Sequence, residues 1–402
     1  MPHAPTRRSV LLAGGAVFGA ANLPRSAHAA AGRDPRLIVL VLRGALDGLA
    51  AVGPAGDPDY AGLHGALALG RDGQTAGLPL DGFFLLNPGM PQFARLFRDK
   101  QAAVIHAVAS PYRERSHFDG QDVLESGFPK PGRTASGWLN RAIDVLPRGE
   151  RTGHARGLAV GAVAPLILRG SASVLGWAPT SLPAAGDDLA MRLLDMYRGS
   201  DPALAASLGQ ALDIEKIAGR DGGKMPGGGE AAVMKQVAEG AARLIAAGDG
   251  PRIAAMAFDG WDTHANEGGP TGRLAMLLSG LDGAFAAFES GLGSSWKDTV
   301  VVAVTEFGRT ARINGTTGTD HGTATVAFLA GGAVRGGRVI ADWPGLSSSA
   351  LHENRDLRPT TDLRAVLKGV LADHLGLSSE VLSQKVFPDS IGVPPMKDLI
   401  GT

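Results

Sequence analysis

Residues 37–42 read Leu-Ile-Val-Leu-Val-Leu, a short and wholly apolar run that contains several β-branched side chains. Such a run is typical of a strand that is buried on both faces of a sheet. The pattern returns at residues 102–109, 252–258, 299–305 and 325–330. Between these runs, residues 273–288 and 361–375 place apolar side chains at helical spacing. The alternation predicts an α/β fold, in which a mainly parallel sheet is flanked by helices on both faces.

Polar residues gather directly beside these apolar runs. In open α/β sheets, ligands bind beyond the carboxyl ends of the strands, so these positions are the candidates for function. Carboxylates, imidazoles, guanidinium groups and one hydroxyl recur there, at Asp47, Arg115, Ser116, Asp262, His264, Glu306, Arg309, Asp320 and His321. We expect these side chains to converge on one edge of the sheet.

The charges of this group indicate a metal. Several carboxylates in a partly dehydrated cleft repel one another unless a cation compensates them. The sequence contains no cysteine, so the ligands would be histidine and carboxylate side chains, which zinc and manganese accept. Single residues also have structural interpretations, since Asp47-Gly48 is a common turn and Ser116 is a good helix N-cap.

The N-terminus is typical of an export signal. Arg7-Arg8 precedes a small-apolar run, and Ala27-His28-Ala29 fits a cleavage site. We predict a twin-arginine signal peptide at residues 1–29, whose apolar run is too short to span a bilayer, and a single domain at residues 30–402 with a flexible loop near 219–229. The expected location is the periplasm or another exported compartment, and the export machinery is an expected partner.

The charge balance argues against a nucleic-acid partner. The chain has 39 basic and 39 acidic residues, and removing residues 1–29 removes three arginines and no acid, which changes the net charge from 0 to −3. No basic block and no interleaving of aromatic and basic residues is present. The sequence therefore predicts no nucleic-acid binding, and no transmembrane segment in the exported domain.

Six motifs together with the start of the domain resemble a known family. The start is LRGALDGL at 42–49, and the six motifs are RSHFDGQDVLESG at 115–127, GWLNR at 137–141, GWDTHANEG at 260–268, TEFGRT at 305–310, GTDHG at 318–322 and ADWPGL at 341–346. They resemble the twin-arginine-exported domain of unknown function 1501 family, an outlying branch of the alkaline phosphatase/sulfatase superfamily. This resemblance implies an alkaline-phosphatase-like fold.

The resemblance also implies a set of site residues. It assigns one or two divalent ions, zinc or manganese, to Asp47, Asp262, His264, Glu306, Asp320 and His321, with Glu306 either a ligand or a support for one. Ser116 would be the nucleophile, and Arg115 and Arg309 would bind the anion. The superfamily uses one further histidine, for which His352 is the first candidate and His117 and His106 are alternatives, whereas His374 is expected to lie within the last helix.

Three functions fit these expectations. The leading hypothesis is an exported metal-dependent hydrolase of phosphate esters, or less favourably sulfate esters, acting on a small molecule or an envelope polymer. The missing cysteine argues against a sulfatase with a modified-cysteine nucleophile. The alternative is a non-catalytic metal-binding or assembly protein of the cell envelope that keeps the scaffold. A third hypothesis is transfer of a phospho group between envelope polymers.

Overall fold

The computed structural model describes residues 33–132, 135–146, 156–179, 193–194, 196–198, 201–218 and 229–401. The predicted signal peptide at residues 1–29 lies outside this range, as does the predicted flexible loop up to residue 228. Contacts divide the chain into two units, Met1–Asp34 and Pro35–Thr402, and the second holds the sheet and its helices. No helix in the described ranges is both long enough and apolar enough to cross a bilayer.

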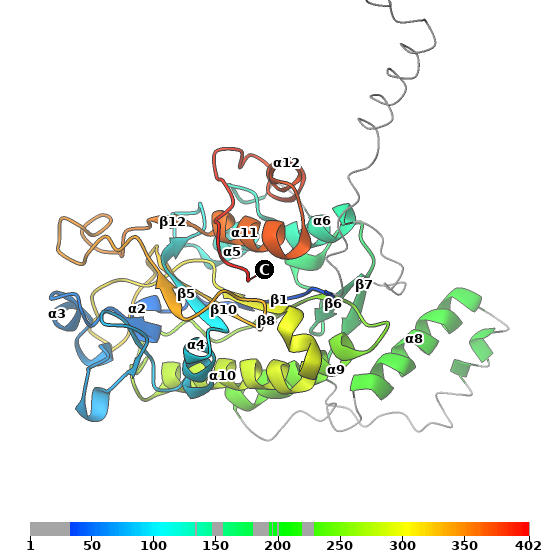
Figure 1. Ribbon diagram of the computed structural model, residues 1–402, viewed down its shortest axis with the longest axis horizontal. Helices are drawn as coiled ribbons and strands as arrows, with labels where there is room; N and C mark the ends of the chain where they lie inside the picture. The colour runs from blue at the N-terminus through cyan, green and yellow to red at the C-terminus, as the bar shows by residue number, and fades with distance from the viewer. Residues whose placement is uncertain are drawn as a thin grey trace, which may run out of the picture. The chain divides into compact units, whose positions relative to one another are not determined.

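A nine-stranded sheet forms the centre of the second unit (Figure 1). Its strands lie in the order β11-β5-β10-β9-β1-β8-β6-β7, and β12 pairs with β5 as well. The strands are β1 (Arg36–Leu42), β5 (Ala102–Ala109), β6 (Gly157–Val160), β7 (Val174–Trp177), β8 (Ile253–Phe258), β9 (Thr299–Val304), β10 (Thr325–Ala330), β11 (Arg338–Ile340) and β12 (Thr361–Asp362). Three short strands, β2 (Val52–Gly53), β3 (Leu78–Pro79) and β4 (Leu85–Leu86), form a second sheet.

One strand of the large sheet runs against its neighbours. β1 is parallel to β8 and β9, and β6 is parallel to both β7 and β8. β10 is antiparallel to both β5 and β9. The start of β10 therefore lies at the edge of the sheet where β9 and β5 end, and this direction decides where the segment before β10 is placed.

Helices cover both faces of the sheet (Figure 1). The side chains of β1 alternate between the two faces, as the pleat of a strand requires. Ile38, Leu40 and Leu42 pack in the core that contains α4 (Pro91–Arg98), α9 (Glu230–Ala246) and α10 (Arg273–Leu292). Leu37 and Val39 pack on the other side with α5 (His117–Ser126), α6 (Trp138–Val145) and α11 (Leu363–Leu375). The remaining helices include α2 (Gly48–Ala51), α3 (Tyr60–His64), α8 (Pro202–Ala218) and α12 (Ser379–Val381).

The main elements confirm the predicted fold class. The apolar runs at 37–42, 102–109, 252–258, 299–305 and 325–330 are all strands of the large sheet. The helical pattern at 273–288 is α10, whose apolar stripe from Leu274 to Phe288 is buried. Each such leucine or phenylalanine stabilises the fold by about 1.5–3 kcal/mol when it is removed from water. The pattern at 361–375 is α11, except that its first two residues pair with β5 as β12.

Candidate metal centre

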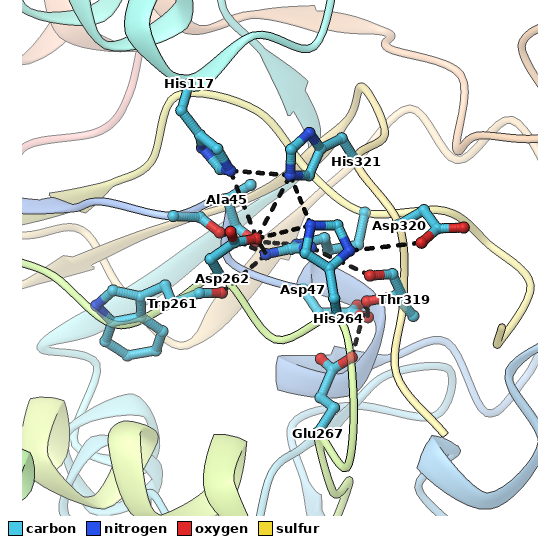
Figure 2. Close-up of polar contacts among 12 residues, drawn as sticks. Ala45, Asp47, His117, Trp261, Asp262, His264, Glu267, Thr319, Asp320 and His321 are labelled. Atoms are coloured by element: carbon cyan, nitrogen blue, oxygen red, sulfur yellow. Dashed lines mark hydrogen bonds and ion pairs between the residues drawn. The ribbon is translucent and has the colours of Figure 1, made fainter. Parts of the chain in front are cut away.

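Polar side chains from three loops meet at one edge of the large sheet (Figure 2). His117 is the first residue of α5, after β5, while Asp262 and His264 follow β8. His321 precedes β10, and the antiparallel direction of β10 brings it to the same edge. His117 and His321 are 204 positions apart in the sequence and are in contact in the fold.

The contacts join three imidazoles and one carboxylate, which we call the His/Asp cluster: His117, Asp262, His264 and His321. His117 Nε2 and His264 Nε2 each lie 2.9 Å from His321 Nε2. Asp262 Oδ1 lies 3.0 Å from His264 Nε2 and 3.4 Å from the Nε2 atoms of His117 and His321. His117 Nε2, Asp262 Oδ1 and His321 Nε2 therefore face a common point, and His264 Nε2 contacts Asp262 and His321 beside it (Figure 2).

These spacings fit the donor set of one metal ion. In a tetrahedral zinc site with zinc–nitrogen bonds of about 2.05 Å, neighbouring ligand atoms are about 3.3 Å apart. The spacings of 2.9–3.4 Å among His117 Nε2, Asp262 Oδ1 and His321 Nε2 are close to this value. The His117 and His321 side chains are each 26% exposed, so the cluster is open to solvent on one side, as a catalytic metal site requires.

The outer contacts of two imidazoles turn their Nε2 atoms toward the common point. His117 Nδ1 lies 2.8 Å from Glu306 Oε1, and His321 Nδ1 lies 3.0 Å from the Arg115 carbonyl. Both partners accept hydrogen bonds, so each Nδ1 donates, and a neutral ring then carries a lone pair on Nε2. Two lone pairs 2.9 Å apart repel each other unless a proton or a cation lies between them. Ligating histidines in metalloproteins are commonly held in this way.

Glu306 supports His117 from a fully buried position. Its Oε1 also accepts hydrogen bonds from Gly44 N at 2.9 Å and from Gln121 Nε2 at 3.1 Å. Burial alone would raise the pKa of Glu306, but the hydrogen bonds from His117 and Gln121 outweigh burial and lower it. Glu306 therefore stays a carboxylate, and of its two expected roles the geometry matches the support of a ligand.

Arg309 is a buried residue that contacts the His/Asp cluster through Asp262. Its Nη2 donates to Asp262 Oδ1 at 2.6 Å, and the guanidinium also donates to the carbonyls of Gly44, Ala45, Trp261 and Thr319. Burial would raise the pKa of Asp262, but the bond from Arg309 outweighs burial and lowers it. Because the Arg309 side chain has no solvent exposure, the geometry does not match the expected binding of a substrate anion and indicates a supporting role instead.

Arg115 is also engaged within the chain. Its Nε and Nη2 donate to Asp356 Oδ2 at 2.9 and 2.7 Å, and Nη2 donates to Glu353 as well. Its backbone has a φ of 61°, a left-handed conformation that costs energy in a residue with a side chain. Fully buried Asp356 thus anchors the residue whose carbonyl orients His321. This role of Asp356 carried no signal in the sequence, and the expected binding of an anion by Arg115 stays a prediction.

Ser116 lies between Arg115 and His117 and forms the N-cap of α5. Its Oγ accepts from Asp119 N at 3.5 Å, and its backbone N donates to Tyr112 Oη at 3.3 Å. The cap contact is long, so the hydroxyl is only weakly held. The expected role of Ser116 as a nucleophile stays a prediction.

Asp47 lies one layer below the His/Asp cluster. Its Oδ1 caps α2 by accepting from Leu49 N at 2.9 Å and Ala50 N at 3.0 Å, and its Oδ2 accepts from Thr319 Oγ1 at 3.1 Å. The same hydroxyl contacts Glu267 Oε2 at 2.8 Å. Burial, followed by the nearby Asp47 charge, raises the pKa of Glu267 well above its usual range. Asp47 is therefore close to the cluster without contacting its ligand atoms among the described contacts.

Of the remaining candidate ligands, some contact the His/Asp cluster and others have partners elsewhere in the chain. Asp320 Oδ1 lies 3.4 Å from His264 Nδ1, on the side of that ring away from Asp262 (Figure 2). His352 Nε2 lies 3.8 Å from Glu353, His374 Nε2 contacts the Arg36 carbonyl at the start of β1, and His106 contacts the Val52 carbonyl. The further histidine of the cluster is His117, which the sequence offered only as an alternative. Its position at the start of the helix that follows β5 was the available signal.

Comparisons with known proteins give similar solved structures and one matching family model. Among solved structures, the chain is similar to a protein in the alkaline phosphatase superfamily from Vibrio parahaemolyticus, with 13% identity over 74% of this chain and 60% of that chain and a TM-score of 0.34. It is also similar to the phosphonate monoester hydrolase of Agrobacterium radiobacter, with 14% identity over 86% and 74% of the two chains and a TM-score of 0.34. A third structure is a 2-O GAG sulfatase, with 11% identity, 90% and 76% coverage and a TM-score of 0.38.

A search of curated proteins gives no significant match. One family model, described as "Protein of unknown function (DUF1501)", matches residues 102–386. This match covers more than half of the 402 residues. The chain therefore belongs to the DUF1501 family of proteins of unknown function.

Proposed function

We propose that this protein is an exported, metal-dependent hydrolase of phosphate esters, with sulfate esters as the less favoured substrates. The observation that carries the proposal is the convergence of His117 Nε2, His321 Nε2 and Asp262 Oδ1 within 2.9–3.4 Å of one another, with His264 Nε2 in contact with His321 and Asp262. Zinc prefers such nitrogen-rich sets, and manganese accepts them. The chemistry that such an ion supplies when bound is Lewis-acid stabilisation of the negative charge on a reacting ester oxygen.

The surrounding residues prepare this site before any substrate binds. Glu306 and the Arg115 carbonyl fix the orientation of His117 and His321. Arg309 keeps Asp262 ionised. Such outer contacts commonly change metal affinity or activity by about 10–100-fold when they are removed. These contacts hold the ligand side chains in place, so little reorganisation is needed when a metal ion binds.

Ser116 is the proposed nucleophile. It directly precedes His117, and the N-terminus of α5 favours the negative charge of a phosphoryl group placed beside it. To attack, its Oγ must give up the 3.5 Å contact with Asp119 N, which is a weak hydrogen bond. The predicted export signal at residues 1–29 implies a substrate outside the cytoplasm, either a small molecule or an envelope polymer.

The test combines metal content with hydrolysis. We expect elemental analysis of the purified full-length chain to show one zinc or manganese per chain, and His321→Ala and Asp262→Asn to lose it. His352→Ala is the matched control, because His352 lies outside the His/Asp cluster and should leave the metal content unchanged. Hydrolysis is measured with 4-nitrophenyl phosphate and 4-nitrophenyl sulfate. A chain that carries no metal, and that neither binds nor is stabilised by added zinc or manganese, refutes the proposal.

A second candidate is a non-catalytic metal-binding protein of the envelope. The specific observation in its favour is that Ser116 caps α5 and that both predicted anion-binding arginines already bond to protein atoms. This candidate predicts bound metal, no hydrolysis of either ester, and unchanged function of Ser116→Ala in cells. The hydrolase predicts that Ser116→Ala abolishes turnover while the metal content stays the same.

A further inference from the structure

We propose that a pocket beside the His/Asp cluster is a subsite for a second oxyanion, a carboxylate, phosphate or sulfate group, carried by the substrate. The inference rests on the proposed function for its place in catalysis, but not for the binding itself. The pocket has a volume of about 270 Å³, and its polar lining includes Arg312, Arg355, Asp320, Asn314 and Thr310. It is of a size for one small group of a larger substrate.

One wall of the pocket is the segment between β9 and β10 that also carries His321. Thr310 Oγ1 accepts from Asp320 N at 3.1 Å and donates to the Arg312 carbonyl at 2.9 Å. Ala311 N donates to the Arg355 carbonyl at 3.1 Å, which joins the two walls. The arginine side chains are therefore carried on backbone segments that are fixed relative to Asp320.

Asp320 is shared between the pocket and the cluster. Its Oδ1 lies 3.4 Å from His264 Nδ1 and accepts from Asn314 Nδ2 at 3.2 Å. A molecule whose reacting ester lies at the His/Asp cluster can therefore extend past Asp320 into the pocket. This adjacency makes the pocket a subsite of the same active site.

The charges of the pocket favour an anion. Arg312 is exposed, and its guanidinium has no hydrogen-bond partner in the described part of the chain. Arg355 contacts Asp356 Oδ1 at 3.2 Å with one nitrogen, and its side chain remains 40% exposed. With Asp320 the lining carries a formal charge of +1. Guanidinium groups match planar or tetrahedral oxyanions through paired hydrogen bonds.

The direct test is a calorimetric titration of metal-free, full-length protein with sulfate near pH 8. We expect saturable binding that weakens at least tenfold in Arg312→Met and in Arg355→Met, since a charge-assisted hydrogen bond contributes about 1.4 kcal/mol or more. His321→Ala should bind sulfate as the wild type does. Arg98→Met, at an exposed arginine of α4 outside the pocket, is the matched control.

The two proposals fail in different ways. If the wild-type chain binds no metal but its sulfate binding still depends on Arg312, the hydrolase proposal is overturned and the pocket proposal is supported. No saturable sulfate binding, or equal binding by Arg312→Met and the wild type, overturns the pocket. With active enzyme, Arg312→Met should raise the KM of carboxyphenyl phosphates about tenfold and leave that of phenyl phosphate unchanged. Arg312→Lys, which keeps the charge, should restore part of the loss.

Discussion

The buried histidine of β5, the strand that leads to the His/Asp cluster, should make the stability of the fold depend on pH. His106 lies within β5 and is fully buried. Its Nε2 donates to the Val52 carbonyl at 2.9 Å, and its Nδ1 accepts from Ala107 N at 2.8 Å. The second contact requires the neutral ring, because a protonated Nδ1 cannot accept a hydrogen bond. Protonation of Nδ1 would place its new hydrogen against the N–H of Ala107.

The size of the effect follows from the pKa. Burial lowers the pKa of His106 from 6.5 to about 4, and the hydrogen bond to Val52 opposes this only in part. Between these values the unfolded chain binds more protons than the folded one, so stability is fully present above about pH 6.5 and is lost as the pH falls toward 4. At about 1.4 kcal/mol per pKa unit, the loss is about 3 kcal/mol in full and about 2 kcal/mol at pH 5.

The assay compares the wild type with His106→Gln, which keeps a donor toward Val52 and removes the titration. Urea unfolding of metal-free protein is followed by the fluorescence of the five tryptophans. Between about pH 7.5 and 5, the wild type should lose about 2 kcal/mol more of its free energy of unfolding than His106→Gln. His352→Gln is the control, because that side chain is 34% exposed and should leave the pH dependence unchanged. Equal losses in wild type and His106→Gln would refute the reasoning.

Three further substitutions test the supports of the His/Asp cluster. Arg309→Met should lower the free energy of unfolding in urea by about 3–5 kcal/mol, since buried carbonyls lose their donor and Asp262 loses its partner. A decrease of less than about 1 kcal/mol would contradict this. Asp356→Asn should weaken zinc binding about tenfold in a chelator competition, because Arg115 is no longer anchored; unchanged affinity would exclude the support role. Gly44→Ala should cost about 2–3 kcal/mol, because φ is 120° and the added Cβ would lie 2.4 Å from Asp262 N; wild-type thermal stability would rule this out.

The sequence by itself determined the main sheet. A strand that is covered on both faces must be apolar at every position, so the runs at 37–42 and 299–305 could be recognised without any tertiary information. The helices α10 and α11 were recognisable because their apolar residues repeat at the helical period. The short strands β6, β7 and β11 were not found, since runs of three or four residues carry too little periodicity.

The loops that carry the chemistry were also readable from the sequence, because polar residues beside buried strands are costly unless they serve a site or find partners. Asp262, His264 and His321 were placed in the site correctly as neighbours, and their metal role stays a prediction. The sequence did not predict which partner each of these polar residues contacts. Asp47 and Glu306 have the same chemistry as Asp262, yet one caps α2 and the other supports His117.

Only the tertiary structure decided which atoms face the common point. The direction of β10 brings His321 to the edge where β5 presents His117, and strand direction leaves no mark in an apolar run. Arg115 and Arg309, which were expected to bind an anion, donate hydrogen bonds to buried carboxylate and carbonyl groups of distant segments. Local sequence fixes the kind of side chain at each strand end, whereas the partner of that side chain depends on contacts between residues more than 200 positions apart.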